Sequence, residues 1–178
     1  LSILDLSNRA SQPIWSPSGR YLIVFNGEIY NHLELRKKLG DFGRNIKSHG
    51  DTVSLAYFID KWGIFKSIEL LDGMFAIGIW DRKARCLSLA RDFAGIKPLF
   101  YGMNNNGLVF ASQYNQISTH PFFKDERINQ SVFKLYIAQH FIPPPFCLLK
   151  NTFSVLPGEI VRFDNYEKQK KKRYWNFP

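Results

Sequence analysis

Cysteine and long apolar runs are both scarce in this sequence. Its 178 residues include two cysteines, Cys86 and Cys147, without the CxxC or cysteine–histidine spacing of a metal site. The longest apolar runs, Tyr21 to Phe25 and Met74 to Trp80, fall far short of the roughly 20 residues that span a bilayer, and no basic-then-apolar signal segment opens the chain. We therefore expect no disulfide framework, no metal site, no membrane contact and a cytoplasmic location.

Acidic residues are fewer than basic ones, 15 against 24, which gives a formal net charge of +9. Five of these cations lie at Lys168 and between Lys170 and Arg173, so the rest of the chain is only mildly basic. The stretch lacks the interleaved aromatic residues of a nucleic-acid reader, and a solvated linker is the more ordinary explanation. We predict no nucleic-acid partner. A composition of 45% hydrophobic and 16% aromatic residues suits one well-buried globular domain.

Two nearly continuous apolar runs, Leu22 to Phe25 and Phe75 to Trp80, are typical of strands that are covered on both faces. We therefore expect Ile23 and Phe25 to be buried on one side of their strand, and Leu22 and Val24 to be buried on the other. Between the runs, the leucines of 33–39 predict a short helix, and 53–62 predicts a longer one.

The second half of the chain predicts short strands and one more helix before a basic linker. Strands joined first by helices and then by hairpins favour an α+β sandwich, in which two sheets pack together and helices cover the outside. The expected elements are strands of a meander at 86–90, 99–101 and 108–111, a hairpin loop at 104–107, a helix over 130–139 and a last strand at 159–163.

Asn26-Gly27-Glu28 follows the first apolar strand and offers three chemical groups in three residues. These are a side-chain amide, a backbone N–H that no Cβ obstructs, and a carboxylate. An amide donor and a backbone N–H together can form an oxyanion hole. The alternative is a plain turn, because Asn-Gly is a strong hairpin signal.

Six blocks of the sequence match one known pattern in the same order and cover nearly the whole chain. They read LSILDLS at 1–7, GRYLIVFNGEIYNH at 19–32, SHGDT at 48–52, LDGMFAI at 71–77, RD with GIKPL at 91–99 and LPG at 156–158. Together they resemble the glutamine amidotransferase domain of glutamine-hydrolysing asparagine synthetases, a class II, N-terminal-nucleophile family. The resemblance implies a four-layer αββα sandwich of the N-terminal-nucleophile hydrolase type, incomplete here because its first strand and helix would precede Leu1.

The resemblance also implies a domain organisation. Residues 1–163 would form a partial glutaminase domain, and 164–178 a basic linker towards an ATP-dependent synthetase domain that follows. The nucleophile of the family is an N-terminal cysteine, whose own amino group can act as the base. It would lie upstream of Leu1, and neither Cys86 nor Cys147 has an adjacent base, so the 178 residues alone are expected to be inactive.

For the substrate L-glutamine, the resemblance implies a role for each residue of a small set. The side chain of Asn26 and the N–H of Gly27 would hold the oxyanion, while Glu28 and Asp51 would bind the ammonium group. The alternative for Asp51 is to cap the N-terminus of the helix that follows it, together with Thr52. The backbone of the first segment would line the pocket at Leu1, Ile3 and Leu4.

Several wider expectations follow from the same resemblance. No cofactor is expected in this chain, ATP and Mg²⁺ would act in the synthetase domain, and a homodimer is left open. Three sites depart from the family pattern, at Val53, at Phe93-Ala94 and at Gln113, and none is an expected glutamine contact. They leave room for another acceptor than aspartate, or for a non-catalytic domain with a structural or regulatory role. Sugar-phosphate and purine-pathway amidotransferases share the domain, but Glu28 and the GIKPL block favour the synthetase branch.

Overall fold

The computed structural model describes residues 11–44, 46, 48, 50–164 and 168–175, and the chain divides into two compact units. One unit comprises residues 1–97 and 158–178, and the other comprises residues 98–157. Among the described residues, we find no helix with the length and apolar character that a membrane span needs.

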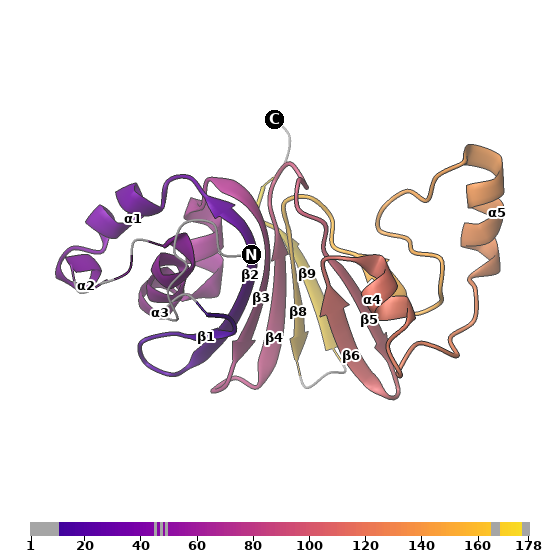
Figure 1. Cartoon of the computed structure of the whole chain (residues 1–178), viewed down its shortest axis with the longest axis horizontal. Coiled ribbons are helices and arrows are strands. Elements are labelled where there is room, and N and C mark those ends of the chain that lie inside the picture. Colours follow the sequence, from indigo (N-terminus) through magenta and orange to yellow (C-terminus); the bar gives the residue numbers. More distant parts are fainter. Residues whose placement is uncertain (1–10, 45, 47, 49, 165–167, 176–178) are drawn as a thin grey trace. The chain divides into compact units, whose positions relative to one another are not determined.

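The first unit is built on a six-stranded sheet, with helices gathered on one of its faces (Figure 1). The strand order is β1-β2-β3-β4-β8-β9, and every neighbouring pair is antiparallel. The strands are β1 (Ile14–Trp15), β2 (Tyr21–Ile29), β3 (Gly73–Asp81), β4 (Cys86–Arg91), β8 (Glu159–Asp164) and β9 (Lys168–Arg173), and the helices are α1 (His32–Lys38), α2 (Asp41–Arg44) and α3 (Asp51–Leu70).

The core of this unit forms where α3 packs against the sheet. Leu55, Phe58 and Ile59 of α3 recur at helical spacing and are fully buried together with Ile23 of β2 and the nearly buried Phe25. Each fully buried apolar side chain of this size contributes about 1.5–3 kcal/mol relative to an exposed one. The core therefore fixes where the C-terminal half of β2 meets the N-terminus of α3.

The opposite face of β2 is less covered than the sequence predicts. Leu22 and Val24 are half-buried, so the expected burial of this pair was wrong, whereas that of Ile23 and Phe25 is confirmed. Ile23 and Phe25 point to the face on which α3 packs, whereas Leu22 and Val24 alternate to the other face of the strand.

The second unit holds a three-stranded antiparallel sheet in the order β6-β5-β7. The hairpin predicted at 104–107 is confirmed, with Asn104 paired to Gly107. The predicted meander was wrong, because β4 belongs to the sheet of the first unit and pairs there with β3 and β8. The elements of this unit are β5 (Phe100–Asn104), β6 (Gly107–Ala111), β7 (Thr152–Ser154), α4 (Tyr114–Ser118) and α5 (Gln130–Gln139).

The basic stretch near the C-terminus is a strand and not a solvated linker. β9 pairs along its length with β8, from Glu159 opposite Arg173 to Asp164 opposite Lys168. The backbone ladder supplies its hydrogen bonds, and lysines suit an outermost strand because they keep the open edge hydrated. The prediction of a linker over 164–178 was therefore wrong at 168–173, and β8 is not the last strand.

Candidate active site

β2 runs through the tripeptide instead of ending before it. The strand extends to Ile29, and Gly27 and Glu28 pair with Phe75 and Met74 of β3. The hairpin-turn alternative for Asn-Gly is therefore wrong, as is the prediction that these residues lie beyond the strand. They form the last part of a paired strand, where the ladder dictates which way each backbone group points.

The backbone N–H of Gly27 points away from β3. In an antiparallel strand, residues two positions apart direct their N–H and C=O groups to the same side. Phe25 donates its N–H to Gln12 Oε1 at 2.6 Å, and Ile29 donates its N–H to Asp51 Oδ2 at 3.0 Å, so both use the side remote from β3. The Gly27 N–H thus lies on the β2 edge between the hydrogen bonds to Gln12 and Asp51.

The partner of Gly27 confirms this direction. Phe75 gives its N–H to Asp92 Oδ2 at 3.2 Å and accepts from the N–H of Asp92 at 2.9 Å, so it turns its polar groups to the far side of β3. The backbones of β2 and β3 therefore approach closely at this pair. A Cβ on Gly27 would lie 2.0 Å from the carbonyl oxygen of Met74, which leaves room for glycine alone.

Asn26 and Glu28 lie on the face of β2 opposite to Phe25 and Ile29, because side chains alternate along a strand. Both are half-buried, whereas Phe25 and Ile29 are buried in the core. The amide and the carboxylate therefore flank the Gly27 N–H along three consecutive residues and remain accessible to a ligand.

Asp51 connects the end of β2 to the start of α3. Its side chain is 94% buried, since its exposed fraction is 6%, and its Oδ1 accepts the N–H of Thr52 at 2.8 Å. Gly50 is the N-cap of α3 and has no side chain to cap with, so the prediction of Asp51 and Thr52 as N-cap was wrong. Asp51 is the first helical residue, and its other oxygen holds the strand through Ile29. Oδ1 also accepts from the hydroxyl of Thr52 at 3.4 Å, whereas Oδ2 has one donor and can accept a further hydrogen bond, which an ammonium group could supply.

A second group of polar residues, His32, Ser54 and Arg36, lies near the Asp51 carboxylate. His32 is buried, and its Nδ1 is 3.5 Å from the hydroxyl oxygen of Ser54. Burial, and then the positive charge of Arg36, lower the pKa of His32, while Asp51 and Glu28 act in the opposite direction. The two carboxylates expected to bind ammonium therefore lie within electrostatic range of the same histidine.

Sequence reasoning missed Arg36 and His32, although a signal was present. Positions 32, 35, 36 and 39 form one helical face, and His32, Leu35 and Leu39 on it are buried. Arg36 is the charged member of that face and is half-buried, whereas Lys37 beside it is exposed. A charged residue inside an apolar helical stripe is an indication of a specific polar partner.

The remaining predicted pocket residues, Leu1, Ile3 and Leu4, lie outside the described residues. The structure therefore brings Asn26, Gly27 and Glu28 together on β2 and links Asp51 to the same strand end.

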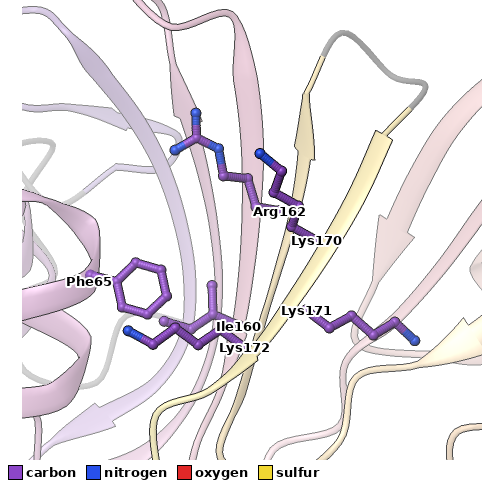
Figure 2. Close-up of a pocket in the computed structure, with 6 residues that line it drawn as sticks. All are labelled: Phe65, Ile160, Arg162, Lys170, Lys171 and Lys172. Atoms are coloured by element: carbon purple, nitrogen blue, oxygen red, sulfur yellow. The ribbon is translucent and has the colours of Figure 1, made fainter.

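A basic groove of about 680 Å³ lies at the other end of the six-stranded sheet (Figure 2). The side chains of Arg162, Lys170 and Lys172 point to the face that carries α3, and Lys171 points the other way. Lys172 Nζ lies 4.0 Å from the ring centroid of Phe65. Three strands separate β9 from β2, so these cations belong to a different place from the tripeptide.

The two cysteines are not placed to act as nucleophiles. Cys86 is fully buried inside β4, and Cys147 is 6% exposed. Burial raises the pKa of both thiols, that of Cys147 to about 12, which disfavours the thiolate. Within the ranges that the structure covers, no cluster of three or more histidine, cysteine or acidic residues could hold a metal ion.

Comparison with known proteins identifies the family of this chain. Residues 1–175 match the family model described as "Glutamine amidotransferase domain". The chain belongs to this family.

The curated relatives show which members of this family the chain is similar to. Asparagine synthetase [glutamine-hydrolyzing] 1 of Bacillus subtilis is 36% identical over 159 residues, which span 89% of this chain and 24% of the relative. A relative from Methanocaldococcus jannaschii is 32% identical over 194 residues, which span all of this chain and 37% of the relative. The chain is thus homologous to the amidotransferase part of asparagine synthetases, and it spans about a quarter to two fifths of the length of these two relatives.

Solved structures show the fold. The glutamine phosphoribosylpyrophosphate amidotransferase of B. subtilis superimposes with a TM-score of 0.63 at 22% identity, over 92% of this chain and 32% of that chain. A class-II glutamine aminotransferase domain protein from Silicibacter pomeroyi gives a TM-score of 0.53 at 12% identity, over 86% of this chain and 67% of that chain. The α+β sandwich of the N-terminal-nucleophile amidotransferases, expected from the sequence, is therefore confirmed as the fold class.

Proposed function

We propose that this chain is the glutaminase part of an asparagine synthetase-like enzyme, which hydrolyses L-glutamine and supplies ammonia for the ATP-dependent amidation of aspartate. The observation that carries the proposal is the direction of the Gly27 N–H on the edge of β2. It lies between the N–H of Phe25, which Gln12 binds, and the N–H of Ile29, which the Asp51 carboxylate binds. Family membership and the relatives' names support the same reading.

The proposed chemistry assigns one role to each group. As the nucleophile attacks the side-chain carbonyl of glutamine, negative charge develops on its oxygen, and the Gly27 N–H and the Asn26 amide receive it. Glu28 and Asp51 bind the α-ammonium group, which stays charged throughout the reaction. The nucleophile in this proposal is the N-terminal cysteine that the family resemblance implies, and Cys86 and Cys147 are buried thiols with raised pKa.

The wider assignments are part of the same proposal. A synthetase domain of the same protein uses ATP and Mg²⁺ to activate aspartate and receives the ammonia. The glutaminase domain itself works without a cofactor. Glutamine, ATP and aspartate are all cytoplasmic metabolites, so we propose a cytoplasmic location.

The departures from the family pattern lie away from the β2 edge, so none of them changes a proposed glutamine contact. Val53 packs against the core of the first unit. The ring of Phe93 lies 5.2 Å from that of Trp175, between centroids. Gln113 is the N-cap residue of α4 and makes no side-chain capping bond. None of the three is on the β2 edge.

Two substitutions test the proposal in the full-length protein, because one should change mainly kcat for glutamine and the other mainly KM. Asn26→Ala removes a donor to charge that develops in the transition state, so it should lower kcat for glutamine by roughly 10²–10³ with little change in KM. Asp51→Asn removes a charge that meets the ammonium in ground and transition states alike, so it should mainly raise KM for glutamine. Steady-state kinetics with glutamine and then with ammonia separate the two effects. Loss of the ammonia-dependent reaction in either variant would show that these residues are structural.

A further inference from the structure

Arg36 makes a closed set of hydrogen bonds from α1 to the start of α3. Its Nε donates to the hydroxyl oxygen of Ser54 at 2.7 Å, and its Nη2 donates to the carbonyl oxygen of Gly50 at 2.8 Å. The hydroxyl of Ser54 donates in turn to the same carbonyl oxygen at 2.9 Å. Each member of the triangle therefore fixes the other two.

The position of Gly50 makes this triangle relevant to Asp51. The carbonyl group of Gly50 is part of the planar peptide group between Gly50 and Asp51. Hydrogen bonds to its oxygen therefore fix the orientation of that peptide group, and with it the position of the Asp51 Cα. The carboxylate is then held at its far end by the N–H groups of Ile29 and Thr52. Arg36 thus fixes the backbone on one side of Asp51, while the N–H groups of Ile29 and Thr52 fix its carboxylate.

The charge of Arg36 needs an explanation that a link between two helices does not supply. Its guanidinium is half-buried, and in the described part of the chain it forms no ion pair within 4 Å. Burial lowers the pKa of Arg36, and the nearby charge of Asp51 opposes that effect. Burying a cation against neutral oxygens is unfavourable, and a neutral side chain could join the helices as well. The negative charge of the nearby Asp51 offsets part of this cost.

We infer that Arg36 is a positioning residue for substrate recognition, which aims the carboxylate of Asp51 at the α-ammonium group of glutamine. The inference rests on the proposed function. It assigns Arg36 no contact with glutamine, so its effect must pass through Asp51.

The first test compares Arg36→Met with Lys37→Met in the full-length protein. Both substitutions remove one positive charge from neighbouring positions of α1, but Lys37 is exposed. Arg36→Met should raise KM for glutamine by about 10-fold, the lower end of what loss of a whole charged hydrogen bond gives, and should leave kcat within about 2-fold. Lys37→Met should behave as the wild type. Ammonia-dependent synthesis should be unchanged in both variants, which checks that the protein is folded.

The second test is a double-mutant cycle with Asp51→Asn. If Arg36 acts through the carboxylate, the double variant should have the same KM as Asp51→Asn alone, within about 2-fold. KM effects that multiply would overturn the inference. A merely structural role would instead lower the thermal midpoint and both the glutamine- and ammonia-dependent reactions together.

Milder variants keep the test decisive if Arg36→Met fails to fold. Arg36→Lys keeps the charge but cannot reach both acceptors with a planar fork, and Ser54→Ala removes one corner of the triangle. Each should raise KM for glutamine by about 3-fold, and wild-type KM in both would overturn the inference. If Asp51→Asn leaves KM unchanged, the proposed function fails. If Asp51→Asn raises KM while Arg36→Met matches Lys37→Met, only the role of Arg36 fails.

Discussion

Gly27→Ala should destabilise the first unit severely, for a reason that is independent of catalysis. An added Cβ would lie 2.0 Å from the carbonyl oxygen of Met74 and 2.7 Å from the Cα of Phe75. Both are backbone atoms of the paired strand, so no side-chain rotation can relieve the overlap. The backbone of Gly27 also has a φ of 155°, which L residues rarely adopt.

The magnitude follows from the geometry. Ordinary contact begins near 3.4 Å, so β2 and β3 would have to separate by about 1.4 Å at this pair. Such overpacking typically costs about 1–3 kcal/mol, and an unfavourable φ adds about 1–3 kcal/mol. Stretching the ladder bonds on either side adds about 1 kcal/mol each. Together these give a loss of about 4–8 kcal/mol, which is a large part of the roughly 5–15 kcal/mol by which a domain is stable.

Gly19→Ala is the matched control for this experiment. Gly19 also has a positive φ, 69°, but a Cβ there would meet nothing within 4 Å. Its substitution should cost about 1 kcal/mol, since only the backbone preference is lost. Urea unfolding followed by tryptophan fluorescence would measure both. Equal losses in the two variants would refute the close-approach argument.

Two further predictions concern buried titratable groups. Because burial lowers the pKa of His32 in the folded state, the neutral imidazole is favoured there, and its contribution to stability is present above the unfolded pKa of about 6.5 and lost as the pH falls below it. The thermal midpoint should therefore fall between pH 7.5 and 5, and His32→Gln should flatten that dependence; an unchanged slope would show that His32 is not the group responsible. The thiols of Cys86 and Cys147 should resist iodoacetamide at pH 8 until urea unfolds the chain. Labelling of either cysteine in the folded state, read by mass spectrometry, would contradict their assignment as buried thiols.

The sequence was sufficient to predict those elements whose ends are marked by residues next to them in the chain. The predicted helix over 130–139 coincides with α5, because the side chain of Asn129 caps it by accepting the N–H groups of Ser131 and Val132, and prolines follow its end. The hairpin at Asn104–Gly107 is confirmed for the same reason, since its turn residues lie in the loop itself.

Pairing between distant segments was not predictable in this way. β9 consists of lysine, glutamine and arginine, with no apolar residue to give a strand period, and it forms because β8 offers a partner ladder. β4 resembles β5 and β6 in local pattern, yet its partners are β3 and β8. Nothing in a six-residue segment specifies which sheet it will join.

For the candidate site, resemblance indicated the residues but not their geometry. Asn26 and Glu28 could be matched to a family pattern, while the direction of the Gly27 N–H depends on the ladder that β2 forms with β3. The position of Asp51 was predicted as a cap, and its contact with Ile29 spans 22 residues of chain, which helix propensity does not register.

A motif can identify a family without belonging to its active site, and Asp92 illustrates the difference. Its side chain is fully buried, and its two oxygens accept three backbone N–H groups, from Phe75, Ile96 and Lys97. Those bonds hold the turn that the RD and GIKPL blocks encode, and they leave the carboxylate closed to a ligand. Asp51 also accepts three hydrogen bonds, two from backbone N–H groups and one from the Thr52 hydroxyl at 3.4 Å, but it keeps an exposed fraction of 6% where Asp92 has none. Residual exposure beside the edge of β2, more than membership of a motif, distinguishes the carboxylate we assign to substrate binding from the one that holds the fold.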